Sequence, residues 1–330
     1  MHALRSSGLV LVGLLAAAAP ASAQVPVPTP PPASPPAQSA PAAAGKLRMV
    51  VKHVSKMDGK VIGVRGDKVT VKGRLKPAVK GQRIQVRMRS RGGKVTVRKA
   101  AVKRNGRFSA PVRLKERGRV SITAVHKASG QIAKAESRKA KLRVYEPDLH
   151  LGSDGALAAL FNRELRQLKY PAPHSKTFDA ATGRAVLTYR KVNDLERVEM
   201  TTAGIVRNVI RGKGGYKVRY PDLGKHVEAD LGKQIIALVD GDELHRVYHI
   251  SSGAPATPTV VGTYHFYLKT PGTNAKGMVD SNYFIRGYAI HGYYTVPTYN
   301  ASHGCLRVPI PDAAAIYDWI EIGDAIRVTY

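Results

Sequence analysis

Cysteine is almost absent from this chain of 330 residues, which contains a single one at position 305. One cysteine cannot form a disulfide bond within its own chain, so a fold stabilised by internal disulfides is excluded. Three explanations remain for Cys305: a small buried residue, a bridge to another chain, or a reactive thiol.

Long hydrophobic runs are also lacking. The longest, residues 8–19, is about 12 residues long, whereas a helix that spans a membrane needs roughly 20. This run follows Arg5 and precedes the small residues Ala21-Ser22-Ala23, which is the pattern of a signal peptide. We therefore expect residues 1–23 to be a signal peptide, and the remainder to be exported to the cell wall or another extracytoplasmic site. Retention of the run as a membrane anchor is the alternative.

Charge is missing from residues 24–45, which consist almost wholly of Pro, Ala, Ser and Thr. Proline stiffens such a segment, and the lack of large apolar side chains prevents it from building a core. We interpret residues 24–45 as a linker.

Acidic residues are scarce in residues 46–145, which contain 31 Lys and Arg against 4 Asp and Glu. This excess predicts an electrostatic role towards a polyanion, either an anionic wall polymer or a membrane surface. Aromatic residues are also scarce there, with only Phe108 and Tyr145, so the stacking platforms of single-strand nucleic-acid binders are missing and no nucleic acid is expected as a partner. The alternative is that the charges only solvate the outer faces of strands.

The same region alternates apolar and polar residues in short runs that are separated by Gly, Asp-Gly and Asn-Gly turns. Period-two alternation with such turns predicts antiparallel strands. We expect a β-sandwich of immunoglobulin-like type over residues 46–146.

Apolar residues return at helical spacing over residues 155–170 and 182–195, which predicts two helices joined by a loop. This region contains Leu165, Leu168, Tyr170, Phe178-Asp179, Thr182, Ala185-Val186, Tyr189 and Asn193-Asp194-Leu195. In these residues it resembles the peptidoglycan-binding helical module, to which we assign residues 149–212, and it departs from the usual pattern at Arg190. A purely structural spacer is the alternative.

Residues 226–330 again have strand-like alternation, with a hairpin turn at Asp240-Gly241 and one short helix over residues 312–320. They predict a mainly β domain with a single helix. The whole chain is therefore expected to be a multidomain, mainly β protein.

Cys305 lies in this last region, within the run SHGCLR at residues 302–307, and a second His-Gly pair, His291-Gly292, ends the strand-like run YFIRGYAIHG. A thiol attacks as its thiolate, and an imidazole nearby can take its proton and return it to a leaving amine. A strand end followed by a loop of ten residues can bring His291 next to Cys305. Metal binding by His291, His303 and Cys305 is the competing chemistry, but no fourth ligand is evident.

Both motifs, AIHG at residues 289–292 and SHGCLR, closely resemble those of the L,D-transpeptidase family, as does the SSGAPATPTVVGTYHF segment upstream. The resemblance covers residues 226–330. It implies that Cys305 is the nucleophile and that His291 is the general base and acid, oriented by the carbonyl of Gly292. It adds His303 to the catalytic set.

The resemblance also implies the groups around the substrate. Ser302 and His303 would shape the pocket, the amides of Gly304 and Cys305 would bind the oxyanion, and Arg307 would hold the motif loop or a substrate carboxylate. A lid within residues 266–284 would cover the site, and Tyr283 would add a donor.

The implied reaction is acyl transfer in peptidoglycan. The cysteine takes the acyl group of a tetrapeptide stem, releases D-alanine, and passes the acyl group to an amine of another stem to form a 3–3 cross-link, without a cofactor or a metal. The resemblance also brings an expected sensitivity to carbapenems. The alternatives are an L,D-carboxypeptidase, with water as the acceptor, and a non-catalytic protein that binds the cell wall.

Overall fold

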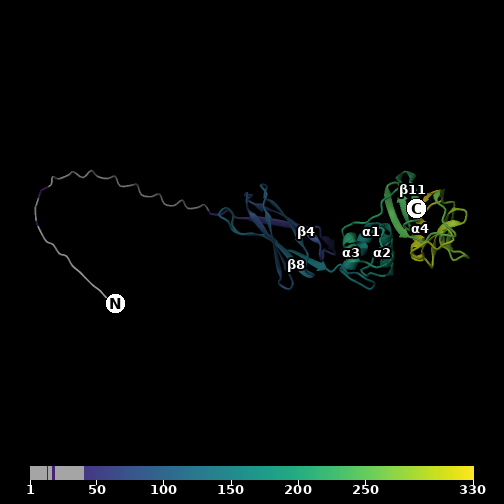
Figure 1. The fold of residues 1–330 in the computed structure, drawn as a ribbon, viewed down its shortest axis with the longest axis horizontal. Coiled ribbons are helices and arrows are strands. Elements are labelled where there is room, and N and C mark those ends of the chain that lie inside the picture. Colours follow the sequence, from purple (N-terminus) through teal and green to yellow (C-terminus); the bar gives the residue numbers. More distant parts are fainter. Residues whose placement is uncertain (1–12, 14–16, 19–40) are drawn as a thin grey trace, which may run out of the picture. The chain divides into compact units, whose positions relative to one another are not determined.

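The computed structural model of the protein describes residues 41–330 together with residues 13, 17 and 18. The expected signal peptide and almost all of the linker lie outside the described residues. Residues Ala42–Tyr330 form one compact unit, which contains every helix and strand of the described part (Figure 1). No helix among the described residues combines the length and apolar character that crossing a membrane requires.

The N-terminal part of this unit is rich in strands, as the sequence predicted. Two sheets form, one with the order β1-β4-β7 and the other with the order β2-β3-β10-β8-β5-β6, to which β9 adds beside β8. Its immunoglobulin-like type stays a prediction. The strands are β1 (Lys46–Lys52), β2 (Ser55–Met57), β3 (Lys60–Val64), β4 (Lys68–Lys76), β5 (Arg83–Ser90), β6 (Val95–Ala101), β7 (Arg107–Arg113), β8 (Gly118–His126), β9 (Ala135–Glu136) and β10 (Ala140–Tyr145).

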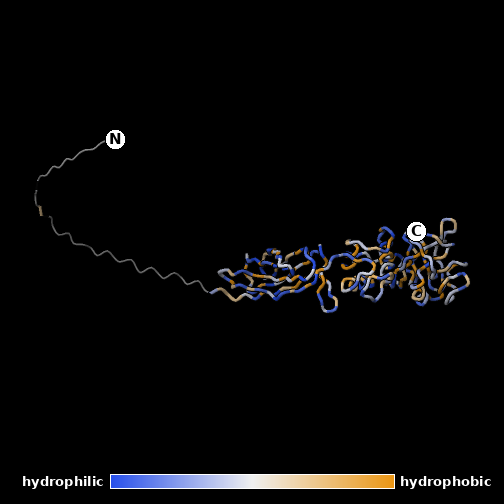
Figure 2. The backbone as a smooth tube through the Cα atoms, turned by 90° about the horizontal axis from the view of Figure 1, so that it is seen from below, coloured by the Kyte–Doolittle hydropathy of each residue, from blue (hydrophilic) through white to orange (hydrophobic). Residues whose placement is uncertain are grey.

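Alternation of side chains explains how these sheets pack. Along β4, Val69, Val71 and Leu75 are fully buried, whereas Lys68 and Lys72 are exposed. Figure 2 shows the resulting mixture of hydrophilic and hydrophobic positions along this part of the chain. One core of apolar residues from both sheets follows, because successive side chains of a strand point to opposite faces.

Three helices come next: α1 (Ala156–Gln167), α2 (Ala180–Val192) and α3 (Ala203–Ile210). The sequence predicted the first two and missed α3, which is only 8 residues long. Its N-cap is Thr202, whose hydroxyl accepts a hydrogen bond from the amide of Ile205 at 3.3 Å. The helices share a core with strands of the C-terminal part, including Ile235 and Val247. Its assignment as a peptidoglycan-binding module stays a prediction.

The C-terminal part contains two further sheets and one helix. The first sheet has the order β13-β12-β11-β19-β14 and the second the order β15-β16-β17-β18. Helix α4 (Ile310–Trp319) packs against β16, β17 and β18. The elements are η1 (Pro221–Leu223), β11 (Lys225–Asp230), β12 (Ile235–Asp240), β13 (Glu243–His249), β14 (Gly262–His265), β15 (Leu268–Thr273), β16 (Val279–Ile285), β17 (Tyr288–Tyr293), β18 (Leu306–Pro309) and β19 (Ala325–Thr329).

The sequence located one turn of this part correctly and missed another. The predicted hairpin at Asp240-Gly241 joins β12 to β13. The run YFIRGYAIHG was wrongly taken as one strand-like run: β16 ends at Ile285, and the chain turns at Arg286-Gly287 into β17. Arg286 adopts a φ of 48°, a left-handed conformation that alternation of side chains does not reveal. The segment 266–284, expected as a lid, contains β15 and most of β16, which pair as a hairpin.

Candidate active site

The pairing of β17 with β18 positions the candidate active-site residues. The two strands are parallel, and His291 lies opposite Arg307 in the ladder. Cys305 comes immediately before β18, two residues ahead of Arg307, so it shares a face of the sheet with Arg307 and His291. Ile290, Leu306 and Val308 occupy the other face and are fully buried in the core. The core therefore anchors both strands while the three polar residues stay together on the opposite side.

Ser302 fixes the turn that carries Cys305. Its buried hydroxyl donates to the carbonyl of Cys305 at 2.6 Å and accepts from the amide of Gly304 at 3.0 Å. Its backbone amide donates to the carbonyl of Ser252 at 2.9 Å, and its carbonyl accepts from the hydroxyl of Thr257 at 2.9 Å. Ser302 thus holds the turn rather than presenting a free hydroxyl to a pocket.

The turn requires glycine at position 304. Gly304 has a φ of 113°, and a Cβ atom there would lie 1.8 Å from a ring carbon of Tyr288. Its carbonyl accepts a hydrogen bond from the buried hydroxyl of Thr259 at 2.8 Å. The amide of Gly304, which the sequence assigned to an oxyanion site, donates instead to Ser302. Of the two expected oxyanion donors, the amide of Cys305 is the one that remains.

His291 is buried and oriented by the residue that follows it. Its Nδ1 lies 3.0 Å from the carbonyl oxygen of Gly292, so Nδ1 carries the proton and Nε2 is left as an acceptor. Burial lowers the pKa of His291, the hydrogen bond to Gly292 opposes this shift, and the charge of Arg307 adds to it. His291 is therefore a neutral imidazole at neutral pH and able to receive a proton.

Gly292 has a second role besides its carbonyl. A Cβ atom there would lie 2.7 Å from the Cβ of Ala313 on α4 and 3.2 Å from the Cβ of Val279 on β16. Glycine at this position lets α4 pack closely on the sheet beside His291.

Cys305 is partly exposed and has no disulfide partner. Its Sγ lies 3.7 Å from the carbonyl oxygen of Gly287, to which the thiol donates. Burial raises the pKa of the Cys305 thiol, whereas the backbone of Ala289 and the charge of Arg307 lower it. The net shift is upward, so the resting group is a thiol and requires a base at the moment of attack.

Arg307 faces the same side of the sheet as Cys305. Its guanidinium lies 4.4 Å from the ring centroid of Tyr293, a cation–π contact, while its backbone pairs with Ser251 through two bonds of 3.0 Å. Within residues 41–330 the guanidinium makes no recorded hydrogen bond or ion pair. The backbone of Arg307 therefore ties the loop down, and its charge remains directed at the site.

The other expected site residues lie less centrally. His303 is exposed and forms no recorded hydrogen bond within the described part of the chain. Tyr283 lies on β16 opposite Ala289 of β17, in the same cross-strand row of residues as Cys305. Its hydroxyl is 3.5 Å from Nδ2 of Asn274. No group of three or more metal-binding side chains occurs among the described residues.

Sequence reasoning missed the residues that support the turn from outside the motif. Tyr288 packs on Gly304, and Thr259 and Ser252 hydrogen-bond to the backbone of the turn. The signal for Tyr288 was available, because it lies in the quoted strand-like run. Thr259 and Ser252 lie in the quoted segment SSGAPATPTVVGTYHF, so a signal existed for them too, but they are more than 40 residues from the motif and only folding brings them to the turn.

The comparisons with known proteins agree with this geometry. Residues 224–328 match the YkuD family, the L,D-transpeptidase catalytic domain. The chain contains an L,D-transpeptidase catalytic domain. The crystal structure of an L,D-transpeptidase from Xylanimonas cellulosilytica DSM 15894 (residues 123–326) is 28% identical with a TM-score of 0.51, and the match covers 55% of this chain and 96% of that one.

Two other solved structures are more distant. An L,D-transpeptidase from Stackebrandtia nassauensis is 17% identical with a TM-score of 0.34, covering 56% of this chain and 96% of that one. One from Mycobacterium smegmatis is 13% identical with a TM-score of 0.29, covering 84% and 98%. No curated protein matches the chain.

The contact between Gly304 and Tyr288 predicts how the catalytic domain responds to one methyl group. Gly304→Ala is expected to slow alkylation of Cys305 by about tenfold or more, because the φ is strained for alanine and the Cβ displaces the turn. The alkylation rate is measured by intact mass, with circular dichroism to verify folding. Gly92→Ala is the control, since a Cβ there meets nothing within 4 Å. Equal rates for wild type and Gly304→Ala would contradict the assigned constraint.

The raised pKa of Cys305 predicts how the rate of its alkylation depends on pH. The raised pKa of Cys305 means that its thiolate forms only as pH rises past the range of an ordinary cysteine. Alkylation of Cys305 should therefore have its midpoint at higher pH than alkylation of a free cysteine peptide. Arg307→Ala should move this midpoint further upward, because the guanidinium favours the thiolate. A midpoint below that of the peptide would show that the thiol is instead activated at rest.

Proposed function

We propose that the protein is an exported peptidoglycan L,D-transpeptidase with Cys305 as its nucleophile. The observation that carries the proposal is the shared face of β17 and β18, which brings Cys305, His291 and Arg307 together within the L,D-transpeptidase catalytic domain. Export is supported by the sequence pattern of residues 1–23.

The proposed reaction begins with the neutral thiol. Nε2 of His291 removes the proton of Cys305 as sulfur attacks the carbonyl carbon of the amide bond before the terminal D-alanine of a tetrapeptide stem. The amide of Cys305 donates a hydrogen bond to the oxyanion that forms. The C–N bond then breaks, His291 returns the proton to the leaving amine, and D-alanine departs, leaving a thioester on Cys305.

An amine of a second stem resolves the thioester. It attacks the same carbonyl carbon, His291 takes a proton from it, and the thiol leaves as the amide bond of a 3–3 cross-link forms. The nucleophile, the proton carrier and the oxyanion donor are all groups of the protein, so the proposal invokes no cofactor.

Charge near the site supports binding of a stem peptide. The guanidinium of Arg307 stacks on the ring of Tyr293 and forms no hydrogen bond or ion pair with the described residues, which leaves its donors available to a substrate carboxylate. We assign His303 and Tyr283 to the walls of the substrate pocket, since His303 is exposed next to the turn and Tyr283 lies in the row of Cys305. Ser302 acts through the turn and not on substrate.

For the helical segment we make a narrower proposal, which concerns its fold and not its ligand. We propose that it is a peptidoglycan-binding-like module, on its resemblance in sequence. The residues that carry the resemblance, among them Leu165, Tyr170, Phe178 and Tyr189, are buried in the core. They therefore support a shared fold, and binding of glycan strands would need other residues on the surface of the module.

Removal of the nucleophile tests the function directly. Cys305→Ala is expected to fold, to form no covalent adduct with a carbapenem, and to release no D-alanine from tetrapeptide stems. Wild type should form one adduct and release D-alanine. His291→Ala should keep the thiol but slow release by about 100- to 10,000-fold, the range for loss of a general base. Intact-mass spectrometry and analysis of the muropeptides give both readouts.

Each alternative predicts a different result in this experiment. Release of D-alanine without a cross-linked product would identify an L,D-carboxypeptidase, with water as the acceptor. No adduct and no release by wild type would contradict the enzyme and favour a protein that only binds the cell wall.

A further inference from the structure

One sheet of the N-terminal part carries an unusual arrangement of like charges. On the outer face of β1-β4-β7, Arg48 pairs with Arg74, which in turn pairs with Arg107 on the next strand. Lys46 lies opposite Lys76, and Lys68 lies opposite Arg113. The outward positions of these strands, which we call the basic face, are Lys46, Arg48, Val50, Lys52, Lys68, Thr70, Lys72, Arg74, Lys76, Arg107, Ser109, Pro111 and Arg113, with no acidic residue among them.

Such a face weakens the fold that carries it. Like charges directly opposite each other on neighbouring strands destabilise a sheet, by roughly the 0.2–1 kcal/mol that opposite charges would contribute. Packing needs only the inner residues, such as Val71 and Phe108, and threonine would serve the outer positions better. A persistent cost without a folding benefit indicates a function for the charges.

We propose that the basic face binds a linear polyanion with repeating phosphate groups, such as an anionic polymer of the cell wall. The rows of charge run across strands about 4.8 Å apart, so a chain lying along the face meets several cations in succession. Basic side chains also occupy the outer face of the second sheet, where Arg119 pairs with Arg143. A flat membrane surface can contact the outer face of only one of the two sheets at a time, whereas polymer chains can bind to both outer faces.

Binding of inorganic polyphosphate to the protein tests the proposed role of the basic face, and this measurement does not depend on the transpeptidase reaction. Binding by wild type should weaken steeply with salt, because each contact with phosphate releases a counterion. Arg48→Gln, Arg74→Gln and Arg107→Gln together should weaken binding about tenfold or more and lower the slope of log Kd against log salt by roughly three. The triple variant should be no less stable than wild type, since it removes repulsion.

Three outcomes would overturn this inference. The matched control is Lys127→Gln, Lys217→Gln and Lys276→Gln, which removes three exposed charges that are not part of the face. An equal loss in this control would show that net charge alone binds polyphosphate. Binding of phosphatidylglycerol vesicles without polyphosphate would identify a membrane surface, and no binding of either would mean that the charges only solvate the sheet.

A second, independent observation concerns a buried lysine on α2. Lys191 is 2% exposed, and its Nζ donates to the carbonyl oxygens of Gln234 at 3.2 Å and Ile250 at 2.9 Å. No carboxylate pairs with it among the described residues. Burial lowers the pKa of Lys191 to about 7, and the charge of Arg197 adds to this shift. An apolar side chain would fill this space at lower cost, so the hydrogen bonds themselves need an explanation.

Those bonds lead to the turn that carries Cys305. The side chain of Gln234 accepts from the amide of Ser252 at 2.9 Å and donates to its hydroxyl at 2.6 Å. The carbonyl of Ser252 accepts from the amides of Ala301 and Ser302 at 2.8 and 2.9 Å. Lys191 on a helix is thus joined, through two strand ends, to the serine that fixes the nucleophile.

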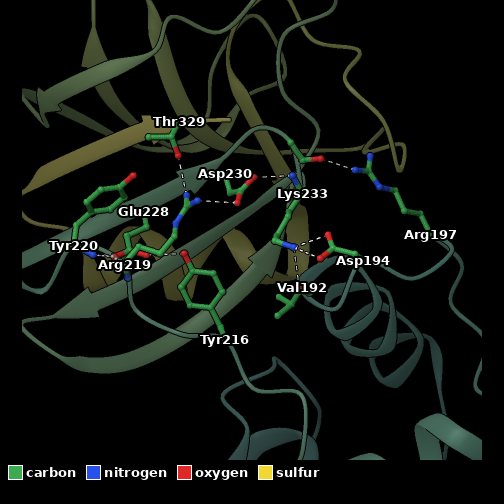
Figure 3. Close-up of polar contacts among 11 residues, drawn as sticks. Val192, Asp194, Arg197, Tyr216, Arg219, Tyr220, Glu228, Asp230, Lys233 and Thr329 are labelled. Atoms are coloured by element: carbon green, nitrogen blue, oxygen red, sulfur yellow. Dashed lines mark hydrogen bonds and ion pairs between the residues drawn. The ribbon is translucent and has the colours of Figure 1, made fainter.

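Arg197 makes a parallel connection (Figure 3). Its guanidinium donates to the carbonyl of Gly232 at 2.7 Å. It also donates to the carbonyl of Thr298 at 3.0 Å, and Thr298 lies in the segment that precedes the nucleophile turn. Lys233 bonds in the opposite direction, from the sheet to Asp194 and the carbonyl of Val192. The helical segment therefore contacts both chain segments that lead into the site.

We infer that Lys191 is a positioning residue for the nucleophile, acting through Gln234 and Ser252 on the turn at residues 302–305. This inference rests on the proposed function. It means that the helical segment is part of the reactive unit and that the domain matched at residues 224–328 is incomplete without it.

Carbapenem acylation of Cys305 tests this role. Lys191→Met keeps an unbranched side chain one atom shorter and removes its donors, so it should lower the acylation rate of the folded protein about ten- to a hundred-fold. Lys233→Met is the control, because it also removes a lysine that joins the helical segment to the sheet but has no bond towards Ser252. It should stay within about twofold of wild type.

Gln234→Leu provides a second variant further along the same path. It should reproduce the loss of Lys191→Met, and the double variant should be little worse than either, as expected for residues acting in series. A lowered melting temperature with an unchanged acylation rate would show that Lys191 is only structural and would overturn the inference. Failure of wild type to react with the carbapenem would instead contradict the proposed function, so the two failures are distinguishable.

Discussion

The register of one parallel strand pair determines what this protein can do. Because His291 lies opposite Arg307, and Cys305 is two residues before Arg307, a base, a thiol and a cation share one face of a sheet whose other face is core. A shift by a single residue would send Cys305 into the core, since side chains alternate along a strand. The apolar residues Ile290, Leu306 and Val308 therefore protect the chemistry indirectly, by making every other register costly.

Pairing alone does not hold the thiol in place, because Cys305 lies just before the strand begins. The turn is fixed by Ser302 and Gly304, and these are fixed by Ser252, Thr257 and Thr259. Polar groups in this region are almost all engaged with backbone, which gives a rigid turn without a disulfide or a metal. Such hydrogen bonds are individually modest, yet breaking one leaves a buried group without a partner, so the turn behaves as a unit.

The sequence revealed the parts of the site that are local along the chain. Cys305, His291 and Gly292 belong to short motifs, and the bond from His291 to the carbonyl of Gly292 joins adjacent residues. Thr259, Ser252 and Lys191 could not be found in this way, because they reach the turn only through the fold. The occupied amide of Gly304 was equally hidden, since it depends on the rotamer of Ser302. Among the elements, α3 was missed because its eight residues make only about two helical turns, and the turn at Arg286-Gly287 because the residues around it alternate like a single strand.

The raised pKa of Cys305 and the lowered pKa of His291 favour a neutral pair over a resting thiolate and imidazolium. A resting thiolate would attack faster but would also be oxidised more readily, and the export that we propose places this cysteine in an oxidising compartment. A neutral thiol avoids that reaction until a substrate carbonyl arrives and His291 can remove the proton in the same step. Burial is thus useful on both sides of the pair: it protects sulfur from oxidation and keeps imidazole free to act as a base.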